Sequence, residues 1–145
     1  VQGRLRTSFQ FLRSAAADRA LTEPAQAALA QVGLSHRAGE RVETLSHGEK
    51  RQLEIAIALA LEPQVLLLDE PMAGMGEDET RKMVELLQGL KHRYTILLVE
   101  HDMHAVFALA DRISVLTAGH VLASDTPDAI RNNPAVQQAY LGGDL

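Results

Sequence analysis

Several residue types are scarce or missing in this 145-residue chain, and each absence excludes a class of protein. There is no cysteine, so neither a disulfide framework nor a thiolate metal site is possible, which fits a reducing compartment. Tryptophan is absent and aromatic residues make up only 3%, which leaves few rings on which nucleic-acid bases could stack. The net charge of -5 also lacks the basic surplus that is typical of phosphate-backbone binding. We therefore expect no nucleic-acid partner.

Long apolar runs are missing too. No stretch approaches the roughly 20 apolar residues that a membrane-spanning helix needs, and the start at Val1 has no signal-peptide core. We therefore expect a cytoplasmic protein that reaches a membrane only through a partner. The remaining composition, 46% hydrophobic and 23% charged, is typical of a globular domain. Because the chain begins with Val rather than Met, we expect it to be part of a longer protein.

The spacing of apolar residues predicts an α/β protein with a helical N-terminal part. Helices are expected at residues 24–32, 49–61, 78–90, 103–110, 127–132 and 134–141, and strands at residues 65–69, 94–100, 113–116 and 121–124. The first two strands and the helix between them predict a right-handed crossover with parallel strands, whose carboxyl ends meet at one edge. The last two strands predict a β-hairpin that is followed by short helices.

The apolar stripes predict which faces are buried. The aliphatic run Val65 to Leu68 indicates a strand that is buried on both faces. The helix at 24–32 should have Pro24 in its first turn. The stripe expected to be buried on the helix at 49–61 comprises Leu53, Ala56, Ile57, Ala60 and Leu61. The stripe on the helix at 78–90 comprises Met83, Leu86, Leu87 and Leu90.

Polar residues suited to phosphate chemistry stand at the ends of three elements. Ser46 and Gly48 begin a helix, where a hydroxyl, a backbone N–H and the helix dipole can hold an anion, although Ser46 can equally be only a helix cap. Asp69 and Glu70 follow the first parallel strand. There one carboxylate can hold Mg²⁺ and its neighbour can accept a proton from water, unless both are simply a solvated strand end.

A histidine follows the second parallel strand. His101 can donate a hydrogen bond to a phosphate oxygen or orient a water molecule. The group Glu100, His101 and His104 offers another interpretation, a metal hydrolase that would bind zinc tightly.

In combination, these motifs resemble those of the ATP-binding subunit of ATP-binding cassette (ABC) transporters. Leu45-Ser46-His47-Gly48-Glu49 resembles the signature motif, Leu66-Leu67-Leu68-Asp69-Glu70-Pro71 the Walker B strand with its catalytic glutamate, and Glu100-His101-Asp102 the switch-histidine region. The segments 53–56, 72–76 and 140–142 are most similar to the branched-chain amino acid and urea uptake group.

The resemblance implies a fold, partners and residue roles. It implies a P-loop NTPase-like core, with residues 1–62 as a helical subdomain and residues 63–145 as the C-terminal part of a RecA-like domain. Asp69 would hold Mg²⁺, Glu70 would be the general base, and His101 would sense the γ-phosphate of ATP. Ser46 and Gly48 would contact the nucleotide of the opposite subunit. The implied partners are a second ATP-binding subunit and membrane-spanning permease subunits, on the cytoplasmic face of the membrane.

One part of such a site is missing from the chain. No Gly-x-x-x-x-Gly-Lys-Ser/Thr occurs, so the loop that cradles the β- and γ-phosphates is absent. Gln10 could suggest a glutamine loop, but its surroundings indicate the helical subdomain. We expect the longer protein to be an ATPase, whereas this chain alone should bind ATP weakly or not at all. The alternative is a non-catalytic module that supplies only the signature face. Without the other half, an exposed strand edge and sheet face predict self-association.

Overall fold

The computed structural model describes residues 19–140, and the chain divides into two compact units, residues 1–99 and 100–145. Each unit contributes one two-stranded sheet to the described part of the chain. The functional boundary predicted between residues 62 and 63 falls inside the first unit and stays a prediction. Gln10 lies outside the described residues.

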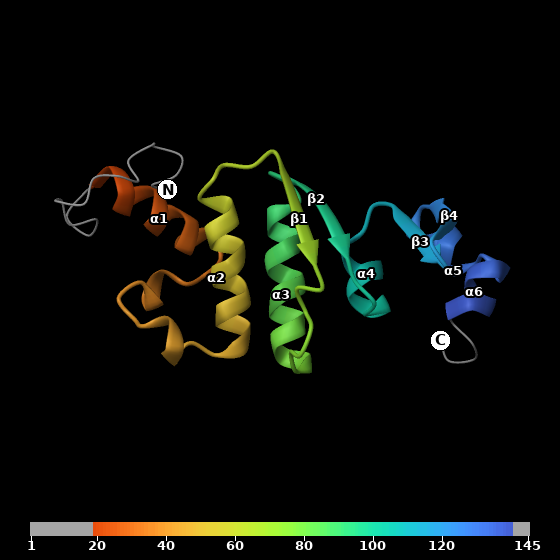
Figure 1. Ribbon diagram of the computed structural model, residues 1–145, viewed down its shortest axis with the longest axis horizontal. Helices are drawn as coiled ribbons and strands as arrows, with labels where there is room; N and C mark the ends of the chain where they lie inside the picture. The colour runs from red at the N-terminus through yellow and green to blue at the C-terminus, as the bar shows by residue number, and fades with distance from the viewer. Residues whose placement is uncertain (1–18, 141–145) are drawn as a thin grey trace. The chain divides into compact units, whose positions relative to one another are not determined.

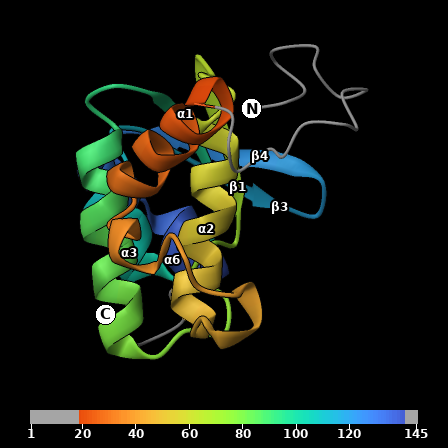
Figure 2. The ribbon, with the colours of Figure 1, turned by 90° about the vertical axis from the view of Figure 1, so that its left-hand side faces the viewer.

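Between residues 19 and 99 the first unit contains three α-helices, two 3-10 turns and a parallel sheet. The helices are α1 (Arg19–Gln31), α2 (His47–Leu59) and α3 (Glu77–Leu90), and the strands are β1 (Val65–Asp69) and β2 (Thr95–Val99). The strands run parallel with Val65 opposite Thr95 and Asp69 opposite Val99, which confirms the predicted strand–helix–strand unit. Figures 1 and 2 show α2 and α3 side by side on one face of this sheet, with α1 packed against α2.

The core of the first unit lies between the sheet and these helices. Leu66 of β1 is 2% exposed, and Met83 and Leu87 of α3 are each 1% exposed. The opposite face of the sheet is bare, because Leu67 is 72% exposed and Leu97 of β2 is 59% exposed. The expectation that β1 is buried on both faces is therefore wrong. The aliphatic run packs on one side only, since the described helices of the first unit cover one side of the sheet.

Two helices also differ in detail from the predicted stripes. On α2 the buried residues are Ile55, Ala56 and Leu59, whereas Ile57 is 62% exposed and Leu61 is 57% exposed. Apolar residues surround almost the whole C-terminal half of α2, so spacing alone did not select the face that meets α1 and α3. In α1 Pro24 lies inside the helix rather than in its first turn. The stripe of α3 is confirmed, with Met83, Leu87 and Leu90 buried and Leu86 half-buried.

The second unit is a β-hairpin with short helices. Its elements are α4 (Met103–Leu109), β3 (Ile113–Thr117), β4 (His120–Asp125), α5 (Pro127–Arg131) and α6 (Pro134–Tyr140) (Figure 1). The strands β3 and β4 pair antiparallel, as predicted, and Ile113, Val115, Ile130 and Val136 form the buried cluster of this unit. The hairpin loop places Ala118 at φ +47° and Gly119 at φ +79°, the positive angles that a two-residue loop requires.

Candidate functional site

Ser46 forms the N-terminal cap of α2. Its hydroxyl oxygen accepts a hydrogen bond from the backbone N–H of Glu49 at 3.2 Å, and a carboxylate oxygen of Glu49 accepts one from the backbone N–H of Ser46 at 2.8 Å. This reciprocal pair is a capping box, which satisfies two backbone donors at the helix start. The capping role proposed for Ser46 is therefore confirmed. Gly48 lies in the first turn, so its N–H has no hydrogen-bond partner within the helix.

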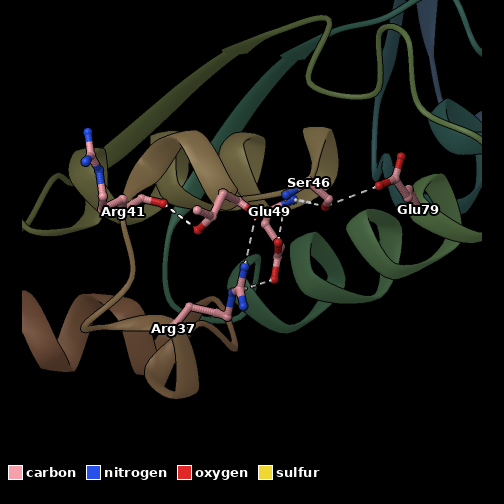
Figure 3. Close-up of polar contacts among 6 residues, drawn as sticks. Arg37, Arg41, Ser46, Glu49 and Glu79 are labelled. Atoms are coloured by element: carbon pink, nitrogen blue, oxygen red, sulfur yellow. Dashed lines mark hydrogen bonds and ion pairs between the residues drawn. The ribbon is translucent and has the colours of Figure 1, made fainter.

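An arginine outside the signature-like motif supports this cap. The other carboxylate oxygen of Glu49 lies 3.2 Å from Nε of Arg37, and Nη2 of Arg37 donates to the carbonyl oxygen of Thr44 at 3.2 Å (Figure 3). The side chains of Arg37 and Glu49 are only 27% and 25% exposed, so water screens the pair incompletely. Arg37 does not stand out in the sequence, because its distance from Glu49 along the chain follows no helical spacing.

A second residue that no sequence pattern predicted, Glu79, occupies the predicted anion site. One carboxylate oxygen of Glu79, in the first turn of α3, accepts a hydrogen bond from the N–H of Gly48 at 3.3 Å. The same oxygen accepts one from the hydroxyl of Ser46 at 3.5 Å (Figure 3). An added Cβ at Gly48 would lie 2.9 Å from that oxygen, so a glycine is needed for this close approach. The sequence signal was the acidic first turn of α3, which holds Glu77, Asp78 and Glu79.

A further contact ties the start of α2 to the loop after β1. Nε2 of His47 lies 3.1 Å from the carbonyl oxygen of Ala73. The next residue, Gly74, has φ +75°, and an added Cβ there would lie 3.4 Å from Nε2 of His47. We name the set Ser46, His47, Gly48 and Glu49 the signature corner. Side chains of the corner and its neighbours thus link α2 to both the loop and α3.

Asp69 and Glu70 lie at the carboxyl end of β1, as predicted. Asp69 is the last residue of the strand and pairs with Val99. Glu70 has φ +45°, which is unusual for a residue with a side chain, and its N–H donates to the carbonyl oxygen of Val99 at 2.9 Å. Its own carbonyl oxygen accepts from the N–H of Ala73 at 3.0 Å. The backbone therefore holds Glu70 in a strained conformation while both residues remain exposed.

The surroundings of Asp69 suit Mg²⁺ better than a metal ion whose ligands are all protein side chains. Mg²⁺ binds one or two carboxylates together with phosphate oxygens and water, and the exposed carboxylate of Asp69 is one ligand of that kind. Within residues 19–140 no group of three or more His, Cys, Asp or Glu side chains could hold a metal ion. The zinc hydrolase interpretation of Glu100, His101 and His104 therefore gains no support from the described geometry.

His101 belongs to the second unit, and its side chain is 76% exposed. The carboxylate of Glu100, whose side chain is 1% exposed, accepts hydrogen bonds from the N–H of His101 at 2.9 Å and of Asp102 at 3.3 Å. Asp102 in turn caps α4. These bonds fix the turn in which His101 stands. A common site of His101 with Asp69 and Glu70 remains a prediction.

The parallel strand–helix–strand unit, its terminal carboxylates and the signature corner are features of an ATP-binding cassette. A family profile described as ABC transporter matches residues 3–73, and one described as branched-chain amino acid ATP-binding cassette transporter matches residues 120–145. The chain belongs to the ABC transporter family of ATP-binding proteins.

Two transport proteins are among its relatives. Over 143 residues the chain is 45% identical to the high-affinity branched-chain amino acid transport ATP-binding protein LivG of Escherichia coli K12. The matched region covers 97% of this chain and 54% of LivG. Over 116 residues it is 43% identical to BraF, a protein of Pseudomonas aeruginosa described in the same words, with 79% and 46% covered. The chain therefore spans about half the length of the curated relatives it matches.

Solved structures agree with the fold. The ADP conformation of an ATP-binding cassette of an ABC transporter superposes with a TM-score of 0.79 at 25% identity, over 96% of this chain and 56% of that one. A nucleotide-free cassette superposes with the same score at 26% identity. These similarities confirm the P-loop NTPase-like fold class. No helix between residues 19 and 140 has the length and apolar character to cross a bilayer.

Proposed function

We propose that the chain is the C-terminal part of an ATP-binding subunit that couples ATP hydrolysis to the import of branched-chain amino acids or similar small solutes. The observation that carries the proposal is the 45% identity to LivG over nearly the whole chain, which includes the signature corner and the carboxylates that follow β1. The names of LivG and BraF supply the solute class.

Each candidate residue has a role in this proposal. Glu70 accepts a proton from the water that attacks the γ-phosphate in line, and its pinned backbone supports such a fixed position. Asp69 holds Mg²⁺, which, when bound, neutralises negative charge on the phosphates. His101 donates a hydrogen bond to the γ-phosphate.

The signature corner serves the other subunit. The hydroxyl of Ser46 and the N–H of Gly48 lie at the start of α2, where a helix favours an anion, and in this proposal they contact the γ-phosphate of a nucleotide bound by the partner. Two subunits therefore complete two sites. Permease subunits in the membrane are the further partners, which places the protein on the cytoplasmic face of the membrane.

Reconstitution tests the catalytic proposal. The chain is mixed with a separately produced N-terminal segment of LivG, which carries the part of that relative that this chain does not span, and phosphate release from ATP is measured. We expect the chain alone to release no phosphate, because the phosphate-cradling loop is absent from its sequence. Turnover that appears on mixing and disappears with Glu70→Gln supports the enzyme. ATP-stimulated association without turnover would instead favour the non-catalytic module.

The bare face of the β1–β2 sheet supports a proposal about the chain alone. Val65, Leu67, Leu97 and Val99 are 51–72% exposed on that face, and apolar patches of this kind drive association. We expect a second copy of the chain to cover it. Sedimentation should show a dimer or larger species that Leu67→Lys reduces to a monomer. Val121→Lys, at a residue that is 63% exposed on the hairpin, is the control, and a monomeric wild-type chain would contradict the proposal.

A further inference from the structure

The signature corner already holds an anion of its own chain. A single carboxylate oxygen of Glu79 accepts hydrogen bonds from both donors that the proposed function assigns to phosphate, the hydroxyl of Ser46 and the N–H of Gly48. Glu79 is half-buried and reaches the corner from a different helix (Figure 3). The absence of a side chain on Gly48 provides the space, because an added Cβ would clash with this oxygen.

Carboxylate and phosphate oxygens compete for the same donors. Both are anionic acceptors that charge-assisted hydrogen bonds and helix starts favour. They cannot share the corner, because two anions at hydrogen-bond distance from one N–H would repel each other strongly in a half-buried place. A phosphate that reaches Gly48 must therefore displace the carboxylate of Glu79. Ser46 stays in place when this happens, since its hydroxyl still accepts from Glu49.

We propose that Glu79 is an internal competitor of phosphate that closes the signature corner until a partner subunit presents its nucleotide. This inference rests on the proposed function. The hydrogen bonds from Ser46 and Gly48 to Glu79 are exchanged for hydrogen bonds to the γ-phosphate, so the carboxylate raises the ATP concentration at which two subunits associate. A partner subunit without nucleotide offers no phosphate to replace the carboxylate of Glu79, so the corner adds no hydrogen bonds to that association. Association of subunits without nucleotide is therefore disfavoured.

Two variants separate competition from a purely structural role. Glu79→Gln keeps an oxygen that can accept from Gly48 but loses the negative charge, whereas Glu79→Ala loses both. If Glu79 competes with phosphate, both variants bind an anion more tightly than the wild type. If it only braces the start of α2, Glu79→Gln resembles the wild type and Glu79→Ala binds less tightly. Glu77→Gln, in the same helical turn and exposed, is the matched control for the loss of one charge.

The test uses the intact chain and inorganic phosphate as the probe. Phosphate is titrated at constant ionic strength, and the amide resonances of Gly48 and Glu49 are followed by NMR. We expect the midpoint to fall about tenfold in Glu79→Gln, the size of one charge-assisted hydrogen bond, and to stay unchanged in Glu77→Gln. Equal midpoints in Glu79→Gln and Glu77→Gln, or no phosphate-dependent shift at Gly48 in any variant, would overturn the inference.

The reconstituted enzyme provides an independent readout. With the LivG segment added, Glu79→Gln should lower the ATP concentration for half-maximal turnover, and an unchanged or higher concentration would contradict the competitor role. The proposed function can fail separately. If reconstitution gives no turnover while the phosphate midpoint still falls, the competition stands and the catalytic proposal is rejected.

Discussion

The signature corner and the end of β1 are held in opposite ways. Side chains fix the corner: Glu49 caps Ser46, Arg37 pairs with Glu49, and Glu79 accepts from Gly48. At the end of β1 the backbone fixes the site, because the N–H of Glu70 donates to Val99. The carboxylates of Asp69 and Glu70 are left exposed. One half of the candidate site is thus organised by polar side chains and the other by sheet pairing.

This difference predicts how each half responds to substitution. A side chain that makes local hydrogen bonds contributes to the stability of the protein, so changes in the corner should alter both folding and function. An exposed carboxylate at a strand end contributes little to stability, so changes there should alter function alone.

The largest expected effect is that of Glu70→Gln on turnover. Gln cannot accept the proton from the attacking water, and loss of a general base lowers the rate by about 10² to 10⁴-fold. The free energy of unfolding should change by less than about 0.5 kcal/mol, because the carboxylate is exposed and the backbone bond to Val99 remains. Phosphate release by the reconstituted enzyme and urea unfolding followed by circular dichroism measure the two quantities.

A matched control is available for that substitution. Glu62 is also exposed and also has a positive φ, +51°, but it follows α2 rather than β1. Glu62→Gln should therefore leave turnover unchanged. Equal losses in the two variants would show that charge in this region, rather than the position of Glu70, supports hydrolysis.

The sequence predicted the elements of this comparison better than their contacts. The aliphatic run before Asp69 and the crossover to β2 follow from local patterns and the handedness of strand connections, so the strand end was placed correctly. The cap at Ser46 was recognised because capping residues are local to the helix start. Glu79 and Arg37 were missed, because their contacts arise only when separate elements pack together.

The burial of the sheet could not be predicted for a related reason. An aliphatic strand such as β1 indicates a sheet that is buried on both faces, but it does not indicate which segment or partner covers each face. Leu66 packs against helices of the first unit, whereas Leu67 has no cover among the described residues of that unit. The face of α2 was equally ambiguous, and packing selected Ile55 over Ile57.

Ser46→Ala tests the side-chain half of the comparison. Loss of an N-terminal cap should lower the free energy of unfolding by about 1 kcal/mol. Ser46→Asn retains a capping oxygen and should recover most of that loss, while it places a bulkier group beside Glu79. Urea unfolding gives the stabilities. If Ser46→Ala were as stable as the wild type, the hydroxyl of Ser46 would contribute nothing to the stability of the corner.

A smaller effect is expected from the ion pair behind the cap. Glu49→Gln keeps an oxygen that can accept from the N–H of Ser46 but removes the charge that pairs with Arg37. It should cost about 0.5 kcal/mol, because such pairs are partly screened, and Glu49→Ala should cost more since it also breaks the capping box. The cost of Glu49→Gln should shrink in about 1 M NaCl, where the Debye length is short. A cost independent of salt would indicate that packing, not charge, is lost.

The smallest effects on stability are expected from glycine substitutions at two residues with a positive φ. Glu70 and Ala118 have nearly equal φ angles, +45° and +47°, but only Glu70 stands in the candidate site. Glycine adopts this conformation without strain, although it also loosens the unfolded chain, so each substitution should stabilise the fold by about 0.5 kcal/mol or less. Ala118→Gly should leave turnover unchanged, whereas Glu70→Gly should abolish it despite the gain in stability. Thermal unfolding and phosphate release, measured on both variants, decide the matter. If Glu70→Gly instead destabilised the protein more than Glu70→Gln does, the Glu70 side chain would itself hold the turn after β1, and the contrast between a backbone-held strand end and a side-chain-held corner would be wrong.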